Sequence, residues 1–246
     1  MKPNNRAIYE EHWSAWLDMK VHGPASRWLR FLIHSQMTSN ADLVAIESIL
    51  DVGCGEGTTT HFLAKMAPDA QVLGVDFSNA GIQCARSRYS RPNLNFLHDE
   101  SLRHLDDKFD LVSAFEVLEH VEEWQDLLER ISRSARRFIW LSFPTGRMRA
   151  FEKQLGHYRN FKPGEVESFL SRRGFTTVVS FYAGFPFFSP LYRDFCNITY
   201  KVSDSFTRGA YGTGKILMSN VIYWLFRFCS TKHRFGDQFC GVFFRT

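Results

Sequence analysis

The stretch Ile49–Gly57, with the sequence ILDVGCGEG, restricts the fold of this chain more than any other part. An apolar run ends at Asp51, three glycines then alternate with other residues, and an amphipathic run begins at Thr58. Glycine is required where a backbone turns sharply at positive φ, or where a ligand lies against bare peptide. The pattern therefore predicts a strand, a tight ligand-binding turn and a helix.

The spacing of the glycines and a second acid sharpen this prediction. The turn reads G-x-G-x-G behind a strand-final acid, whereas the turn of dinucleotide-binding domains reads G-x-G-x-x-G. A second apolar run, residues 71–75, ends at Asp76, at about the distance where a carboxylate meets ribose hydroxyls. The dinucleotide-binding domain of a dehydrogenase remains the alternative at this point.

Strand-like and helix-like patterns alternate along the chain from residue 48 onward. Such alternation predicts an α/β fold, a doubly wound and mostly parallel sheet with helices on both faces. We expect seven strands and, between them, four main helices. The strands are expected at residues 48–53, 71–76, 94–98, 109–115, 137–143, 176–182 and 238–244, and the helices at 58–67, 79–89, 122–134 and 163–173.

The chain of 246 residues is expected to form one domain with four parts. Residues 1–40 form an N-terminal helical cap, broken at Gly23-Pro24, that either closes over the ligand or only covers the sheet. Residues 48–182 form the ligand-binding core, and 238–246 the last strand. The intervening residues 183–237 are too long for a bare connection and rich in aromatic side chains, which predicts a folded insertion or lid with an apolar helix at about 215–229.

Composition and charge exclude several classes of protein. The net charge of +4 is mild, and no segment is basic enough to predict nucleic-acid binding. Five scattered cysteines without metal-type spacing predict reduced thiols and a cytoplasmic protein. The first residues lack the apolar core of a signal peptide. The longest apolar run, Ile216–Cys229, is shorter than the roughly 20 residues that span a bilayer, so no transmembrane segment is expected.

Six short sequence blocks follow one another along the chain: DVGCGEG at 51–57, VDFS at 75–78, HDE at 98–100, FDLV at 109–112, EVLEHV at 116–121 and LSFP at 141–144. In this order they resemble the class I S-adenosylmethionine-dependent methyltransferases of the small-molecule and glycan type, which have a Rossmann-like fold. A dehydrogenase domain would leave the block that begins at Glu116 unexplained. The resemblance also implies that the last strand runs antiparallel to its neighbours.

This resemblance implies that S-adenosylmethionine is the cofactor and S-adenosylhomocysteine the product. The glycine turn would hold the carboxypropyl part against backbone, and Asp51 would order the turn and face the amino group. Asp76 would accept both ribose hydroxyls, Asp99 would receive the adenine amino group, and Phe77 would pack on the adenine face. The expected cofactor-binding residues are Asp51, Gly53, Cys54, Gly55, Asp76, Phe77, Asp99, Glu100 and Glu116.

Methyl transfer is an in-line displacement at the sulfonium methyl, and a hydroxyl acceptor must also lose a proton. Three candidates for this chemistry lie beyond the fourth and fifth strands: His120, His157 and Tyr158. The last two lie in a His-Tyr-Arg segment that resembles one found in many small-molecule and glycan methyltransferases. We expect His120 or His157 to act as a neutral base near its ordinary pKa.

Two other interpretations of the block after the fourth strand stay open. Glu116, Glu119 and His120 share one face if the turn is helical, and with His157 they could hold a divalent ion. Glu-x-x-Glu-His resembles the metal site of quinone-precursor O-methyltransferases and of small-RNA 2′-O-methyltransferases. Alternatively, the block is only a packing feature at a helix start. A metal is possible but is not the favoured interpretation.

The expected function is therefore methyl transfer in biosynthesis to a small-molecule or glycan acceptor, at oxygen. The alternatives are N- or C-methylation of a natural-product or lipid precursor, or a cofactor-binding partner subunit without catalysis. The aromatic insertion either forms a core for its own helices or lines the acceptor pocket, which would favour an apolar or lipid-linked acceptor. Cationic residues next to the 215–229 helix allow a peripheral membrane contact or are simply a solvated end: Arg227, Lys232, His233 and Arg234.

Overall fold

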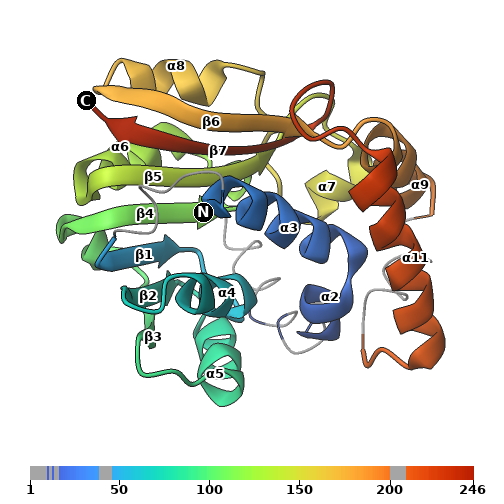
Figure 1. Cartoon of the computed structure of the whole chain (residues 1–246), viewed down its shortest axis with the longest axis horizontal. Helices are drawn as coiled ribbons and strands as arrows, with labels where there is room; N and C mark the ends of the chain where they lie inside the picture. Colours follow the sequence, from blue (N-terminus) through green and yellow to red (C-terminus); the bar gives the residue numbers. More distant parts are fainter. Residues whose placement is uncertain (1–9, 11–12, 14–16, 39–45, 200–208) are drawn as a thin grey trace.

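A computed structural model describes residues 10, 13, 17–38, 46–199 and 209–246. Two parts of the prediction fall outside these residues. They are the start of the N-terminal cap, expected to be helical from residue 7, and Tyr200 and Phe206 of the aromatic insertion. Within the described part, seven strands form one sheet in the order β3-β2-β1-β4-β5-β7-β6 (Figure 1). The predicted α/β fold with a doubly wound sheet is confirmed.

The strands agree with the predicted ranges to within two residues at each end. The strands are β1 (Ser48–Val52), β2 (Gln71–Asp76), β3 (Leu94–His98), β4 (Phe109–Phe115), β5 (Ala135–Pro144), β6 (Phe175–Ala183) and β7 (Gln238–Arg245). The helices are α2 (Leu17–His22), α3 (Pro24–Thr38), α4 (Thr58–Met66), α5 (Asn79–Arg88), α6 (Trp124–Ser134), α7 (Ala150–Gln154), α8 (Glu165–Ser171), α9 (Arg193–Ile198) and α11 (Thr213–Cys229). The sequence interpretation missed α7, α9 and the short helical turns η2 (Arg103–Asp106), η3 (Leu118–His120) and η4 (Phe187–Tyr192).

The order in which strands are added to the sheet reverses at one place, between β1 and β4. β1 pairs in parallel with both β2 and β4, so the chain leaves β1 toward one edge and returns from β4 toward the other. β7 runs antiparallel between β5 and β6, as the resemblance implied. In open α/β sheets, ligands bind at the carboxyl ends of the strands, where the strand order reverses. Figure 1 shows these ends pointing toward the side where α2, α7, α9 and α11 gather.

Apolar layers cover both faces of the sheet. On one face, Trp28, Leu32 and Ile33 of α3 are almost wholly buried in a cluster with side chains of β1, β4 and β5. On the other face, α6 and α8 supply the buried Leu128 and Phe169. Fully burying a side chain of this size contributes roughly 1.5–3 kcal/mol. The central strands are therefore apolar on both faces, as the continuous apolar runs of the sequence require.

The N-terminal cap is divided at Gly23 and attached to the sheet by polar contacts. α2 ends at His22 and α3 begins at Pro24, a residue that suits the first position of a helix. Gln36 of α3 donates to the carbonyl of Cys240 at 2.6 Å and accepts from the indole N–H of Trp140 at 2.8 Å. Because all three groups are buried, these bonds fix the position of α3 over the sheet.

The insertion between β6 and β7 is closed at its base. Ala183 and Gln238 pair across the last rung of the sheet, and Gly184 then donates to the carbonyl of Thr231 at 2.8 Å. Gly236 crosses so close to Ala183 that a Cβ at Gly236 would lie 1.9 Å from the Ala183 carbonyl oxygen. We call this paired base, residues 183–186 and 230–238, the neck.

Beyond the neck, the insertion packs on the N-terminal cap. Phe188 of η4 and Phe226 of α11 contact Trp28 of α3, with ring centroids 4.7 and 5.9 Å from the indole. The insertion is therefore a folded part of the protein, as predicted, with α11 beginning two residues earlier than expected. None of the described helices is both long enough and apolar enough to cross a membrane.

Candidate active site

A cavity of about 1030 Å³ opens at the carboxyl ends of β1, β2 and β4. This volume is at the upper end of ordinary ligand pockets, so the cavity has room for more than one small molecule. Its walls come from the glycine turn, the turn after β4, the segment around α7 and the insertion. The lining includes nine of the twelve predicted site residues: Asp51, Gly53, Cys54, Asp76, Phe77, Glu100, Glu116, His120 and His157.

The glycine turn has the backbone that its sequence requires. Gly53 and Gly55 both lie at positive φ, +72° and +54°, where a side chain is disfavoured. A Cβ at Gly53 would lie 2.5 Å from Val117, and one at Gly55 would lie 2.4 Å from the ring of Trp13. Glu10 also accepts hydrogen bonds from the first N–H groups of α5. The N-terminal segment therefore contacts the glycine turn through Trp13 and the start of α5 through Glu10, while α3 covers the sheet.

Asp51 and Asp76 are buried at the ends of β1 and β2 and are held by hydrogen bonds. Asp51 accepts from the hydroxyls of Thr60 at 2.6 Å and Ser113 at 2.7 Å. Asp76 accepts from the backbone N–H groups of Gly55 and Ser78, both at 2.8 Å, one on each oxygen. Each oxygen keeps a second lone pair, so Asp76 can order the glycine turn and still accept two hydroxyls. Burial raises the pKa of both carboxyls to about 6.

The third strand presents its acids differently from the expectation. Asp99 is buried and accepts from the ring of His104 at 2.7 Å and from the His104 backbone N–H at 3.1 Å. Burial alone would raise the pKa of Asp99, but these hydrogen bonds lower it to about 2. Asp99 does not line the cavity, whereas its neighbours Glu100 and Leu102 do. Gly55 and Tyr158 are the other two predicted residues that lie outside the lining.

The turn after β4 is not the α-helical start on which the shared-face argument depended. Glu116 has φ +57°, an uncommon conformation for a residue with a side chain, and η3 is a single 3₁₀ turn. One carboxylate oxygen of Glu116 accepts from Ser142 at 2.8 Å and from Gln238 at 2.7 Å. Ser142 of β5 and Gln238 of β7 thus fix Glu116, which is not among the described side chains whose ligand atoms converge at η3.

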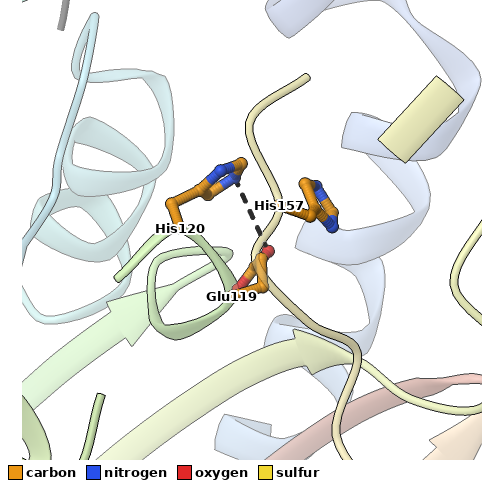
Figure 2. Close-up of side chains that lie close together, drawn as sticks. All are labelled: Glu119, His120 and His157. Atoms are coloured by element: carbon orange, nitrogen blue, oxygen red, sulfur yellow. Dashed lines mark ion pairs between the residues drawn. The ribbon is translucent and has the colours of Figure 1, made fainter. Parts of the chain in front are cut away.

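Glu119, His120 and His157 instead form a cluster of titratable side chains, here called the Glu-His-His cluster. Figure 2 shows the three side chains converging from η3 and from the segment after α7. The two imidazole centroids are 4.5 Å apart, and His120 Nε2 lies 3.9 Å from a carboxylate oxygen of Glu119. The backbone N–H of Tyr158 donates to the Glu119 carbonyl at 2.8 Å, which joins the two segments.

Burial determines the charge of this cluster. Burial and the nearby Glu116 carboxylate raise the pKa of Glu119 well above its ordinary value. Burial lowers the pKa of His120 well below its ordinary value and that of His157 to about 4. The expectation that either histidine titrates near its ordinary pKa is therefore wrong, because a desolvated imidazolium is disfavoured. At neutral pH both rings are therefore neutral, and burial favours the protonated form of Glu119.

The cluster also offers a donor set for a cation. One atom each from Glu119, His120 and His157 lie within 4.8 Å of one another. Neither carboxylate oxygen of Glu119 has a hydrogen-bond partner among the residues that the structure describes. Two imidazoles and one carboxylate suit zinc, iron or manganese better than magnesium, which prefers oxygen ligands. The residues thus fit a transition metal, and of the four ligands that the sequence interpretation offered, Glu116 is the one outside the group.

Several lining residues were not among the predicted site residues. Arg193 of α9 is almost fully buried and forms an ion pair with the buried Glu152 of α7. Tyr192, Lys20 and Gln238 also line the cavity. The aromatic insertion signalled Tyr192 as part of a lid, but no local pattern marks the pair Glu152 and Arg193. The two residues are 41 positions apart and meet only in the folded chain.

Comparison with known proteins agrees with this geometry. The sequence profile of a family described as "Methyltransferase domain" matches residues 50–137. The ubiquinone biosynthesis O-methyltransferase of Pasteurella multocida is 30% identical over 129 residues, which cover 47% of this chain and 52% of that protein. The trans-aconitate 2-methyltransferase of Methylobacterium radiotolerans is 34% identical over 98 residues, 39% of this chain and 37% of that protein. The chain thus spans about half the length, or less, of these curated relatives.

Solved structures extend the likeness from the core to the complete fold. The magnesium protoporphyrin IX methyltransferase of Synechocystis PCC 6803 with bound S-adenosylhomocysteine superimposes with a TM-score of 0.61. The alignment covers 98% of this chain and 100% of that chain at 17% sequence identity. The domain match begins in β1 and ends in β5, the part that carries the glycine turn and Asp76. Residues 50–137 therefore match a methyltransferase domain, and the whole chain has the fold of these methyltransferase structures.

Proposed function

We propose that this protein transfers a methyl group from S-adenosylmethionine to a hydroxyl oxygen of a small-molecule or glycan acceptor. One observation carries the proposal: a single cavity joins Asp76 and the glycine turn to the Glu-His-His cluster. A cofactor held at Asp76 and Gly53 would extend toward the turn after β4. The acceptor would then lie between this turn, His157 and the insertion.

In this proposal, the cofactor supplies the activated methyl group and the chain supplies position and a proton acceptor. The acceptor oxygen forms a bond to the methyl carbon as the bond from carbon to sulfur breaks, and S-adenosylhomocysteine leaves. The attacking hydroxyl becomes strongly acidic as its oxygen is alkylated. A neutral imidazole of His120 or His157 can therefore take the proton even though its pKa is low.

The walls around the cluster support an acceptor with an apolar body. Phe151 and Leu155 of the α7 segment and Phe188 and Tyr192 of η4 line this part of the cavity. The ion pair of Arg193 with Glu152 fixes α9 against α7 at the same place. We infer that the insertion, residues 183–237, acts as a lid that selects the acceptor. An apolar or lipid-linked hydroxyl compound satisfies both the walls and the cluster.

Transfer from isotopically labelled cofactor tests the proposal directly. The protein would be incubated with S-adenosylmethionine carrying a ¹³C methyl group and with an organic extract of cells that lack its gene. The carbon chemical shift of the new methyl group distinguishes O-methyl from N-methyl and C-methyl products. A labelled methyl ether or ester is expected. A product labelled at nitrogen or carbon would replace O-methylation with one of the alternatives, and no transfer would support a non-catalytic subunit.

A metal-assisted form of the same reaction is the second candidate. The converging ligand atoms favour it, and so do the two Glu119 oxygens, which have no hydrogen-bond partner in the described part of the chain. In that form, Glu119, His120 and His157 would hold the ion, which would supply Lewis-acid polarisation of the acceptor oxygen. The two forms differ in the protonation of Glu119, because a carboxylate must lose its proton to bind a metal.

A further inference from the structure

The outward face of α11 is apolar along its whole length. Six of its side chains are between 37% and 71% exposed, and at 3.6 residues per turn they fall within a sector of about 120°. The sector contains no charged residue. We call these residues the apolar stripe: Leu217, Met218, Val221, Trp224, Leu225 and Phe228.

The opposite face of α11, which contacts the protein, contains polar groups. Ser219 is fully buried, and Asn220 accepts from Arg27 of α3 at 2.6 Å. The guanidinium of Arg227 lies 3.9 Å from the ring centroid of Phe31. A surface helix of a globular protein normally directs its apolar residues inward and its polar residues to solvent. α11 is instead apolar on both sides, because Ile222, Tyr223 and Phe226 pack inward while the stripe faces solvent. Burial within the chain therefore does not explain the stripe.

A further exposed aromatic follows shortly after the end of this helix. Phe235 is 78% exposed and has φ +65°. A left-handed conformation costs a residue with a side chain roughly 1–2 kcal/mol, and the exposed ring gains little from contact with the protein. The chain thus holds a phenylalanine in a disfavoured conformation at the surface, next to Arg234.

The charge around the stripe has one sign. Residues 211–236 contain four cationic side chains and no aspartate or glutamate. Three of the four follow the middle of the helix, and the ammonium of Lys232 and the guanidinium of Arg227 both lie over the ring of Phe31. The segment that carries the apolar stripe is therefore net positive, which complements an anionic surface. The cationic residues are Lys215, Arg227, Lys232 and Arg234.

We propose that α11 and Phe235 form a membrane-binding surface whose partner is a bilayer that contains anionic phospholipid. Tryptophan and phenylalanine beside lysine and arginine are the composition of interfacial helices, which lie in the headgroup region without crossing the bilayer. A helix of 17 residues with an apolar stripe on one side fits this position. Neutral apolar contact with a second copy of the chain would leave the run of cations unexplained.

This surface lies directly behind the acceptor cavity. Phe226, on the inner side of α11, packs against Phe188 and Tyr192 with centroid distances of 5.4 and 5.1 Å. Both partners line the cavity. A bilayer against the apolar stripe would therefore be one layer of side chains away from the site, in a position to deliver an amphiphilic acceptor. That last step rests on the proposed function, whereas membrane binding itself does not.

Co-flotation of the purified full-length chain with lipid vesicles tests the proposal without any assay of methyl transfer. The vesicles would contain phosphatidylcholine alone or phosphatidylcholine with phosphatidylglycerol. We expect binding at least tenfold stronger to the anionic vesicles, and weaker binding as salt is added. Equal or absent binding to both kinds of vesicle would overturn the proposal.

Two matched pairs of variants assign the binding to this face. Replacing both Trp224 and Phe228 by serine should weaken binding by about 100-fold, whereas Phe244→Ser, an exposed aromatic on β7, should leave it unchanged. Arg234→Glu should weaken binding about tenfold, and Arg172→Glu on the far side should not. Arg234 is at the surface, so this second pair stays informative even if the double variant fails to fold.

A second copy of the chain is the alternative binding partner of the apolar stripe. Sedimentation at several protein concentrations, without lipid, would reveal it. A dimer that the Trp224 and Phe228 substitutions abolish, together with no flotation of the wild type, would overturn membrane binding in favour of a second copy. A wild-type monomer that floats with anionic vesicles supports the proposal.

Discussion

The two halves of the cavity differ in how their polar groups are satisfied. Near the glycine turn, the buried carboxylates of Asp51 and Asp76 each accept two hydrogen bonds from the chain. Near the Glu-His-His cluster, Glu119 is buried with both oxygens lacking a partner among the described residues. Buried polar groups are normally hydrogen-bonded, so the second half is the one that is incomplete without a ligand. The comparison indicates a preorganised cofactor half and an acceptor half that depends on what binds there.

The largest expected effect lies in the acceptor half. His120→Ala or His157→Ala, whichever removes the base, should lower turnover by about 10²–10⁴-fold, because a positioned proton acceptor contributes that much. Cofactor affinity, measured by calorimetry, should stay nearly constant. His34→Ala, on the exposed side of α3, is the control. Full activity in both single variants would remove the histidines from the chemistry and weaken the oxygen-acceptor proposal.

In the cofactor half, Asp76→Ala should weaken S-adenosylmethionine binding by roughly 2–3 kcal/mol, which is about 30- to 150-fold. The loss has two sources: the hydrogen bonds from Asp76 to the ribose and the bond by which Asp76 holds the N–H of Gly55 in the glycine turn. Asp99→Ala should have a much smaller effect, since Asp99 bonds to His104 outside the lining. Calorimetry with the cofactor, and with NAD as a ligand expected not to bind, measures both. Equal losses in the two variants would place the adenine at Asp99 after all.

The lid proposal predicts that a change in the insertion alters the acceptor KM without altering cofactor affinity. Tyr192→Ala should raise the acceptor KM about tenfold by opening the cavity wall, with cofactor affinity unchanged. Phe195→Ala changes an exposed aromatic on the same insertion and should alter neither quantity. Steady-state kinetics in both substrates would show the split. An equal change in cofactor affinity for Tyr192→Ala would argue against a lid that acts on the acceptor alone.

Lowering the pH should have two opposite effects at Asp51 and Asp76: a gain in stability of the cofactor-free protein and a loss of cofactor affinity. The pKa values of Asp51 and Asp76 are raised in the folded protein, so it binds more protons than the unfolded chain between about pH 4 and pH 6. The cofactor-free protein should therefore gain stability from these groups as the pH falls through this range. Cofactor affinity should fall about tenfold between pH 7 and pH 5, because a protonated Asp76 accepts hydroxyls less well. Thermal melts with and without cofactor measure both trends, and an affinity that is constant with pH would contradict them.

Chelation is expected to have the smallest effect. We expect EDTA to change the rate less than twofold, since the favoured mechanism needs only a neutral imidazole. Zinc, manganese and magnesium would be added back separately. Loss of activity in EDTA with restoration by one of these ions would reverse the order of the two mechanisms. Restoration by zinc or manganese but not magnesium would match the donor set of Glu119, His120 and His157.

The fold and the cofactor half were predictable because their signals are local. The glycines of the turn must lie at positive φ, and the acids that end β1 and β2 follow directly from the strand pattern. The direction in which a side chain points also depends on how more distant parts of the chain fold. Asp99 follows directly after β3, much as Asp51 and Asp76 lie at the ends of their strands. The turn η2 nevertheless folds back, so that the ring of His104 binds the Asp99 carboxylate. No pattern in the sequence marks that short turn.

The acceptor half was less predictable because it depends on tertiary burial. His120 and His157 were both chosen from the sequence, since each follows a strand that ends at this edge. Their neutral state was expected, but their low pKa values follow from the depth of the pocket, which no residue pattern reveals. Likewise, the spacing of Glu116, Glu119 and His120 predicted a shared face, and the positive φ of Glu116 removed it.

The neck has a consequence for how such an enzyme can change over time. The insertion leaves the sheet at Ala183 and returns at Gln238, and these two residues are partners on one rung. The segment between them contributes no residue to the pairing of β6 with β7 or to the glycine turn. If the insertion selects the acceptor as proposed, cofactor use and acceptor choice are encoded in separate parts of the gene, and changes in one part can alter the product without changing the other.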